Sequence, residues 1–329
     1  MSAPWIAAQL RRLVPQRGHA LLLQGPSGLG QYALAFELAR AWLCEQPGPE
    51  GACGQCPSCH AVEVRTHADL FLLMPETFML ELAWPLGEKA QTDIDEKKRK
   101  PSAQIRIEAM RDAIEFAQRT SGRGRGKVVL VYPAERMNQV TANALLKTLE
   151  EPPGSVRFVL ATEAAHQLLP TVRSRCLAHT MCWPEEAQAV AWLREQGVKD
   201  ADAPALLRAA GGRAEDALLM AQAGIDGKSW AAWPKAVARG EGAAVANWSP
   251  PRLVGALLKL CHDMMAVRSG AVPRFFAAAD LPPAASFAAL SAWSRELSAT
   301  ARTVEHPFNP GLMIEALVSQ ARSALNSGH

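Results

Sequence analysis

Short apolar runs alternate with amphipathic stretches through the first half of the chain, and this alternation predicts its fold. An apolar run covers residues 20–24, and Leu34, Leu38 and Trp42 then recur at helical spacing within 31–43. Strands that alternate with helices in this way are typical of a parallel sheet with covering helices. The pattern continues with predicted strands at 69–74, 127–132 and 156–161 and with predicted helices at 104–119 and 138–150.

The alternation is interrupted between Pro75 and Pro101. This segment ends in a run of charged residues at 93–100, whose last four positions are all cationic. Charged runs without hydrophobic periodicity are typical of solvated segments. We therefore interpret residues 75–101 as a solvated loop insertion, with a binding tail as the alternative.

After Trp183-Pro184 no strand pattern remains, and helical stretches rich in alanine and leucine continue along the chain. Gly211-Gly212 and Ala223-Gly224 mark short breaks between them. These features predict three domains. The expected ranges are 1–182 for an α/β domain with a parallel sheet, and 183–224 and 225–329 for two helical domains.

The composition is that of a globular protein. The 329 residues are 49% hydrophobic and 20% charged, and the formal net charge of +3 is too small to indicate nucleic-acid binding by itself. No apolar run approaches the ~20 residues that span a bilayer. The first residues show no cationic stretch followed by an apolar core. We therefore expect a cytoplasmic protein with no membrane segment and no signal peptide.

Four of the seven cysteines form a C-x8-C-x2-C-x2-C array within residues 44–60. Thiolates bind zinc tetrahedrally, and two C-x2-C steps bring several sulfur atoms to one ion. Four thiolates leave no open coordination position, so we expect a structural zinc site in a reducing compartment. The predicted ligands are Cys44, Cys53, Cys56 and Cys59.

Two histidines near the array leave a mixed ligand set open. His60 and His67 could each replace one sulfur atom, although we favour the set of four thiolates. The other cysteines, Cys176, Cys182 and Cys261, are expected to be ordinary buried thiols.

A glycine loop follows the first apolar run directly. Its sequence at 25–32, Gly-Pro-Ser-Gly-Leu-Gly-Gln-Tyr, has the frame of the phosphate-binding pattern G-x-x-x-x-G-K-[ST]. Gly25 and Gly30 keep this frame, but Gln31 replaces the lysine and Tyr32 replaces the serine or threonine. Neither side chain can offset phosphate charge or hold magnesium through a small hydroxyl. We favour an empty structural turn over residual nucleotide binding.

The predicted strand at 127–132 ends without the acid that a P-loop ATPase needs for its magnesium ion. Tyr132-Pro133 occupies the end of the strand, and Glu135 lies beyond it, where a carboxylate would be misplaced. Because the glycine loop has also lost its working residues, we expect no ATP hydrolysis by this chain.

Two further stretches complete a set of motifs. Residues 143–153 read Asn-Ala-Leu-Leu-Lys-Thr-Leu-Glu-Glu-Pro-Pro, and Ser174-Arg175-Cys176 follows the last predicted strand. With the glycine loop and the cysteine array, these stretches resemble the clamp-loader branch of the AAA+ ATPases over about residues 19–182. The resemblance implies a P-loop-type domain with a zinc knuckle, then a helical lid at 183–224 and a helical oligomerisation collar at 225–329.

The resemblance also implies a function. In the clamp loader of bacterial DNA polymerase III, five subunits form a ring that places a sliding clamp on primed DNA. This chain would be a non-hydrolysing member of such a hetero-pentamer, beside ATPase subunits and a delta subunit. It would belong to a DNA-directed DNA polymerase holoenzyme, a nucleotidyltransferase, without polymerase chemistry of its own.

The resemblance implies that this chain contributes an arginine to catalysis by a neighbouring subunit. The family's Ser-Arg-Cys arginine reaches into the ATP site of the adjacent subunit, and here that residue is Arg175, with Arg173 as the competitor. A guanidinium stays ionised and stabilises charge on a transferred phosphoryl group. Relatives that hydrolyse ATP also carry a sensing arginine in a G-x-x-R-D-A-L pattern, and here Glu215 takes its place.

Two other functions remain as alternatives. A stand-alone ATPase or nucleotide switch would need the glycine loop to bind nucleotide. A zinc-dependent DNA-binding protein is opposed by the small net charge and by the closed set of thiolates. The basic, glycine-rich loop at 119–127 could contact DNA or a neighbouring subunit, or it could be an exposed turn.

Overall fold

The computed structural model describes residues 3–283, 285–304 and 309–327 of the chain. It divides into two compact units, of which the first ends at Pro184 and the second begins at Glu185. The further separation of residues 183–224 from residues 225–329 stays a prediction.

A five-stranded parallel sheet forms the centre of the first unit, in the order β2-β3-β4-β1-β5. Leu22 in β1 lies opposite Leu160 in β4 on one side and Ala178 in β5 on the other. Parallel neighbours need crossover connections, and helices accordingly separate the strands along the chain. The strands are β1 (Ala20–Gln24), β2 (Leu70–Leu73), β3 (Lys127–Val131), β4 (Val156–Thr162) and β5 (Leu177–Thr180).

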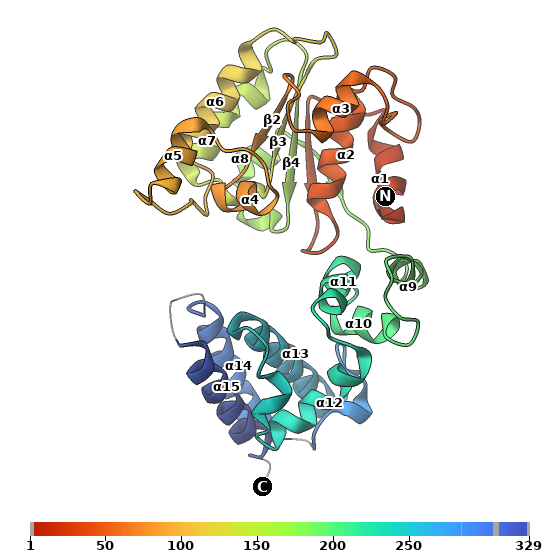
Figure 1. Ribbon diagram of the computed structural model, residues 1–329, viewed down its shortest axis with the longest axis vertical. Helices are drawn as coiled ribbons and strands as arrows, with labels where there is room; N and C mark the ends of the chain where they lie inside the picture. Colours follow the sequence, from red (N-terminus) through yellow and green to blue (C-terminus); the bar gives the residue numbers. More distant parts are fainter. Residues whose placement is uncertain (1–2, 284, 305–308, 328–329) are drawn as a thin grey trace. The chain divides into compact units, whose positions relative to one another are not determined.

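Helices cover both faces of this sheet (Figure 1). α1 and α2 lie on one face with α3 beside α2, and α6, α7 and α8 lie on the other. The expected α/β class with a parallel sheet is therefore confirmed. The helices are α1 (Pro4–Leu13), α2 (Gln31–Leu43), α3 (Pro57–Glu63), α4 (Glu76–Glu81), α5 (Glu88–Asp95), α6 (Ile107–Gln118), α7 (Gln139–Glu150) and α8 (Pro170–Arg173), with 3-10 turns at Ala134–Arg136 and Ala165–Gln167.

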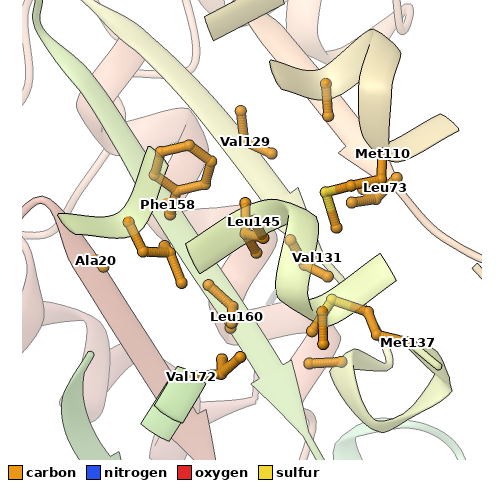
Figure 2. Close-up of a cluster of buried hydrophobic side chains, with 14 of the residues drawn as sticks. Ala20, Leu73, Met110, Val129, Val131, Met137, Leu145, Phe158, Leu160 and Val172 are labelled. Carbon is orange, nitrogen blue, oxygen red and sulfur yellow. The ribbon is translucent and has the colours of Figure 1, made fainter. Parts of the chain in front are cut away.

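A hydrophobic core lies between the sheet and the helices α6, α7 and α8 (Figure 2). Val129 and Val131 of β3 and Phe158 and Leu160 of β4 pack in this cluster with Leu145 of α7, and all five are fully buried. The intervening residues of both strands are buried against the face that carries α2. Burial on both faces explains why these strands appear in the sequence as continuous apolar runs.

β5 is the strand that the sequence pattern did not predict. It pairs with β1 at an edge of the sheet, and Leu177, Ala178 and Thr180 are exposed. An edge strand that buries neither face has no apolar alternation for the sequence to display.

Residues 75–101 contain two short helices, α4 and α5, in place of the expected solvated loop. Glu76 is buried, and its carboxylate accepts hydrogen bonds from the Arg99 guanidinium at 2.5 and 2.8 Å and from the Ser102 N–H at 2.8 Å. Burial raises the pKa of Glu76, but the bonds from Arg99 and Ser102 together hold it below its ordinary value. This ion pair ties the start of the insertion to its end.

The described residues of the second unit form helices and connecting turns without a strand. α13 packs against α14 and α15, and α12 packs against α15. In this described part and in the first unit, no helix is both long enough and apolar enough to cross a bilayer. The helices are α9 (Glu186–Glu195), α10 (Ala203–Ala209), α11 (Ala214–Gln222), α12 (Gly227–Ala238), α13 (Pro250–Arg268), α14 (Phe287–Ala301) and α15 (Pro310–Leu325), with 3-10 turns at Gly242–Val245 and Ala278–Asp280.

Lys259 of α13 joins several elements of this unit. Its Nζ donates to the carbonyl oxygen of Ala209 at the end of α10, 2.8 Å away. The same atom lies 5.6 Å from the ring centroids of both Trp230 and Phe275. Burial, followed by the charge of Arg213, lowers the pKa of Lys259 to about 8.

Candidate functional site

The glycine loop connects β1 to α2, as the sequence predicts. Gly30 adopts a φ of 81°, a left-handed conformation that favours glycine, just before the first residue of α2. Gln31 is 1% exposed, and its side-chain Nε2 donates to the carbonyl oxygens of Gly25 at 2.9 Å and Pro26 at 2.7 Å. An uncharged amide that binds its own loop therefore occupies the position from which a lysine would reach a phosphate.

Tyr32 and Tyr132, which replace the two magnesium-binding positions, contact each other with ring centroids 5.4 Å apart. Phe36 stacks on Tyr32 at 5.9 Å, and Trp84 of the insertion donates its indole N–H to the Tyr32 hydroxyl at 2.7 Å. Burial raises the pKa of Tyr32, so its hydroxyl stays protonated at neutral pH. We call these four residues the aromatic cluster.

The carboxylates that follow β3 and β4 are both engaged within the chain. Glu135 accepts hydrogen bonds from the Thr162 hydroxyl at 2.7 Å and from the backbone N–H of Glu163 at 3.2 Å. The Tyr132 hydroxyl donates to the Glu163 carboxylate at 3.2 Å. Donors within the chain thus occupy the carboxylates of Glu135 and Glu163, which follow β3 and β4.

Arg175 lies at the surface between α8 and β5, with 29% of its side chain exposed. Its Nε donates to a carboxylate oxygen of Glu150, the last residue of α7, at 2.6 Å, and its Nη2 donates to the same oxygen. Its Nη1 donates to the carbonyl oxygen of Thr171 at 2.8 Å. The competing Arg173 is exposed, and no described residue pairs with its side chain.

The four predicted cysteine ligands come together in one cluster. All four Sγ atoms lie within 4.8 Å of one another, with Cys44 and Cys56 at 3.8 Å and Cys53 and Cys59 at 3.9 Å. A regular tetrahedron with Zn–S bonds of about 2.3 Å has sulfur–sulfur edges of about 3.8 Å. The cluster therefore fits a tetrahedral metal ion.

The backbone around this cluster favours the thiolate form of Cys56, whereas burial and the Cys56 thiol raise the pKa of Cys59 to about 12. The N–H of Cys53 donates to the Sγ of Cys44 at 3.3 Å, and the N–H of Cys59 donates to the Sγ of Cys56 at 3.4 Å. Gly54, with a φ of 74°, turns the chain between Cys53 and Cys56. Burial raises the pKa of Cys56, but the backbone donors and the neighbouring thiols together lower it to about 6.

Neither histidine near the array joins this cluster in the described part of the chain. His60 is exposed, and the Nδ1 of the buried His67 accepts the N–H of Asp69 at 3.1 Å. Of the other thiols, Cys261 is buried, but Cys182 is exposed, so the expectation of a buried thiol is wrong for Cys182.

The basic loop at 119–127 is held against the rest of the first unit. The buried Asp69 accepts the backbone N–H groups of Gly122 at 2.7 Å and Arg123 at 2.9 Å. The Arg123 guanidinium lies 3.4 Å from the carboxylate of Glu45, the neighbour of a cysteine ligand. The loop is therefore docked near the cysteine cluster. A contact with DNA or with a neighbouring subunit stays a prediction.

The sequence analysis did not identify two residues of the candidate site, Trp84 and Glu150. Trp84 lies in the segment interpreted as a loop, and its partner Tyr32 is 52 positions away. Glu150 belongs to the quoted stretch at 143–153, but its partner Arg175 is 25 positions away. No spacing rule links such pairs, because the packing of α7, α8 and the insertion brings them together.

A family model described as "DNA polymerase III, delta subunit" matches residues 10–182, more than half of the chain. The matched range contains the glycine loop, the cysteine cluster and Arg175.

Curated relatives and solved structures complete the comparison. DNA polymerase III subunit delta' of Pseudomonas aeruginosa is 38% identical over 192 residues, which are 58% of this chain and 52% of that protein. The subunit delta' of Escherichia coli is 35% identical over 235 residues, 70% of this chain and 62% of that protein. The chain thus spans about half to three fifths of the length of these relatives.

A solved structure of a DNA polymerase III gamma subunit-related protein from Thermotoga maritima aligns with 97% of this chain and 99% of its own, at 17% identity and a TM-score of 0.47. The family assignment itself rests on the sequence match over residues 10–182. On that match, the chain belongs to the DNA polymerase III delta subunit family.

Proposed function

We propose that this chain, like the relatives named DNA polymerase III subunit delta', is a subunit of DNA polymerase III and works in the clamp loader without hydrolysing ATP. The observation that supports this proposal best is that side chains of the chain itself occupy the glycine loop. Gln31 binds the carbonyl oxygens of its own loop, and Tyr32 packs against Tyr132. A site with neither a lysine nor a magnesium-binding acid lacks the groups that phosphoryl transfer needs.

Arg175 supports an active role for the chain at a neighbour's ATP site. Its guanidinium is partly exposed, stays ionised and keeps an N–H of Nη2 free of acceptors among the described residues, and guanidinium donors suit phosphate oxygens. Charge on the transferred phosphoryl group is what such an arginine stabilises, and an arginine supplied in trans raises turnover by ~10³–10⁵. We propose that Arg175 acts in this way.

The proposed setting is a cytoplasmic hetero-pentameric ring with clamp-loader ATPase subunits and a delta subunit, acting on a sliding clamp and primed DNA. Residues 183–224 would be the lid of this chain, and residues 225–329 its collar in the ring. For the cysteine cluster we propose zinc, because thiolates at tetrahedral spacing suit this ion. Four protein ligands leave no open position, so the ion would be structural.

The test is ATP hydrolysis stimulated by clamp and primed DNA in the reconstituted loader. We expect Arg175→Ala to lower turnover at the adjacent ATP site by ~10³ or more, because one trans arginine is lost. Gel filtration should show an intact complex. Arg173→Ala is the matched control and should keep the turnover of the unchanged chain.

Equal rates for the unchanged chain and Arg175→Ala would remove the trans role from Arg175. A loss with Arg173→Ala alone would assign the role to that residue instead.

A further inference from the structure

The surface arginine of the proposed function is held by one carboxylate of its own chain. Nε and Nη2 form one edge of the guanidinium fork, and both donate to Glu150. From this geometry we propose that Glu150 is a positioning residue, which fixes Arg175 in the orientation that meets the neighbour's ATP. This inference rests on the proposed function of Arg175.

The contacts of Arg175 leave part of its fork available. Each terminal nitrogen of a guanidinium carries two hydrogens, so Nη2 keeps one N–H after its bond to Glu150. Nη1 faces the carbonyl oxygen of Thr171 at 2.8 Å and the Ser174 hydroxyl at 3.5 Å. The edge bound by Glu150 is therefore fixed within the chain, while the remaining N–H of Nη2 has no acceptor among the described residues.

Glu150 stands on a rigid support. It is the last residue of α7, directly after Leu149, which is fully buried in the core against the sheet. Pro152-Pro153 follows and prevents the helix from continuing. A carboxylate at this point limits the rotamers of a long, flexible side chain, and such preorganisation is what a phosphate contact in a transition state requires.

A role in folding alone does not account for this pair. The side chains of Arg175 and Glu150 are 29% and 47% exposed, and ion pairs with this exposure add little to stability. The loss of Glu150 should therefore leave the fold intact. Glu151, the next residue, is exposed and forms no ion pair within the described residues, so it provides a matched control.

The experiment compares Glu150→Gln, Glu151→Gln, Arg175→Ala and the double variant Glu150→Gln/Arg175→Ala in the reconstituted loader. We expect Glu150→Gln to lower kcat at the adjacent ATP site by about 10- to 100-fold, the range typical of a misplaced catalytic group. KM for ATP should change little, because the contact acts in the transition state. The double variant should be no slower than Arg175→Ala, since Glu150 acts only through Arg175.

A second readout uses the isolated chain and needs no ATP. The Nε–H of Arg175, observed by ¹⁵N NMR, should exchange slowly with solvent in the unchanged chain and in Glu151→Gln, and quickly in Glu150→Gln. This readout reports the pairing itself, whatever the loader does.

The outcomes separate this inference from the proposed function. If Arg175→Ala keeps full turnover, the proposed function fails and the inference fails with it. If Arg175→Ala is slow but Glu150→Gln matches Glu151→Gln, only the role of Glu150 is overturned. A higher kcat in Glu150→Gln would also overturn it, because Glu150 would then restrain Arg175. An additive loss in the double variant would show that Glu150 acts through another residue.

Discussion

Among single residues, Gln31 and Tyr32 have structural roles of their own in the first unit. Gln31 supplies donors to two carbonyl oxygens of the glycine loop, which would otherwise depend on water. Tyr32 joins β3 to the insertion, because its ring packs on Tyr132 and its hydroxyl accepts from Trp84. The loop is thus part of the packing of the first unit.

Restoring the two consensus residues should therefore not restore nucleotide binding. In the double variant Gln31→Lys/Tyr32→Thr, Phe36, Trp84 and Tyr132 remain, and Tyr132 still offers no carboxylate for magnesium. We expect calorimetric titration with magnesium and ATP to give no binding tighter than about 1 mM, close to −4 kcal/mol. Circular dichroism of the variant is the control for folding. A micromolar Kd for ATP would show that Phe36, Trp84 and Tyr132 do not prevent nucleotide binding at the glycine loop.

How far the sequence predicts a residue's role depends on how local its partners are. The cysteine array and the glycine loop are short-range patterns, so their spacing already indicates their chemistry. Asp69 gave no such signal. It holds Gly122 and Arg123, more than 50 positions away, through bonds that exist only once β2 and the basic loop are in place.

At the scale of elements, the cysteine cluster joins α2 to α3. Cys44 lies at the end of α2, and Cys56 precedes α3, which contains Cys59. A metal ion bound to these thiolates would fix the connection between the two helices. Since the reduced chain must bring four thiols together, metal binding and the folding of this segment are coupled.

The variant Cys59→Ser should lose this metal. We expect about one zinc per chain in the unchanged protein and almost none in the variant, because three thiolates bind far more weakly than four. The first unit should also lose about 3 kcal/mol of stability, the effect of removing a ligand present at 100 times its Kd. Elemental analysis and thermal unfolding measure the two effects.

Cys182→Ser is the matched control, because Cys182 is exposed and lies outside the cluster. It should keep both the zinc content and the unfolding temperature. Metal-free unchanged chain with four titratable thiols at this cluster would contradict the zinc assignment.

The sequence predicted the buried helices and strands better than the exposed ones. β1 and α2 are largely buried, and their predicted bounds, 20–24 and 31–43, agree with the structure. β5 is exposed along most of its length, and no residue of α5 is buried. Without a core-facing stripe, neither element leaves a hydrophobic period in the sequence. The ion pair of Glu76 with Arg99 joins the two ends of the insertion. It likewise leaves no hydrophobic period in the sequence.

For the whole molecule, the structure gives two compact units, and the further division of the second unit into a lid and a collar stays a prediction. Within the second unit, contacts link the predicted lid to the predicted collar. Lys259 binds Ala209, and Arg274 donates to the carbonyl oxygen of Gly211 at 3.2 Å. We therefore expect residues 185–329 to unfold together. Lys259 should matter most, because its partly buried ammonium group contacts α10 and lies beside the rings of Trp230 and Phe275.

The stability of the second unit should consequently rise with pH in a way that depends on Lys259. Its folded-state pKa of about 8 lies below the value of about 10.4 for a free lysine. Between these values the unfolded chain binds more protons, so the free energy of unfolding increases as pH rises. From pH 7.5 to 9.5 the gain should be about 2 kcal/mol in the unchanged chain and absent in Lys259→Met. Urea unfolding followed by tryptophan fluorescence measures it, with the exposed Lys228→Met as the control that keeps the gain. Parallel pH profiles for the unchanged chain and Lys259→Met would mean that α10 and α13 are not coupled through this lysine.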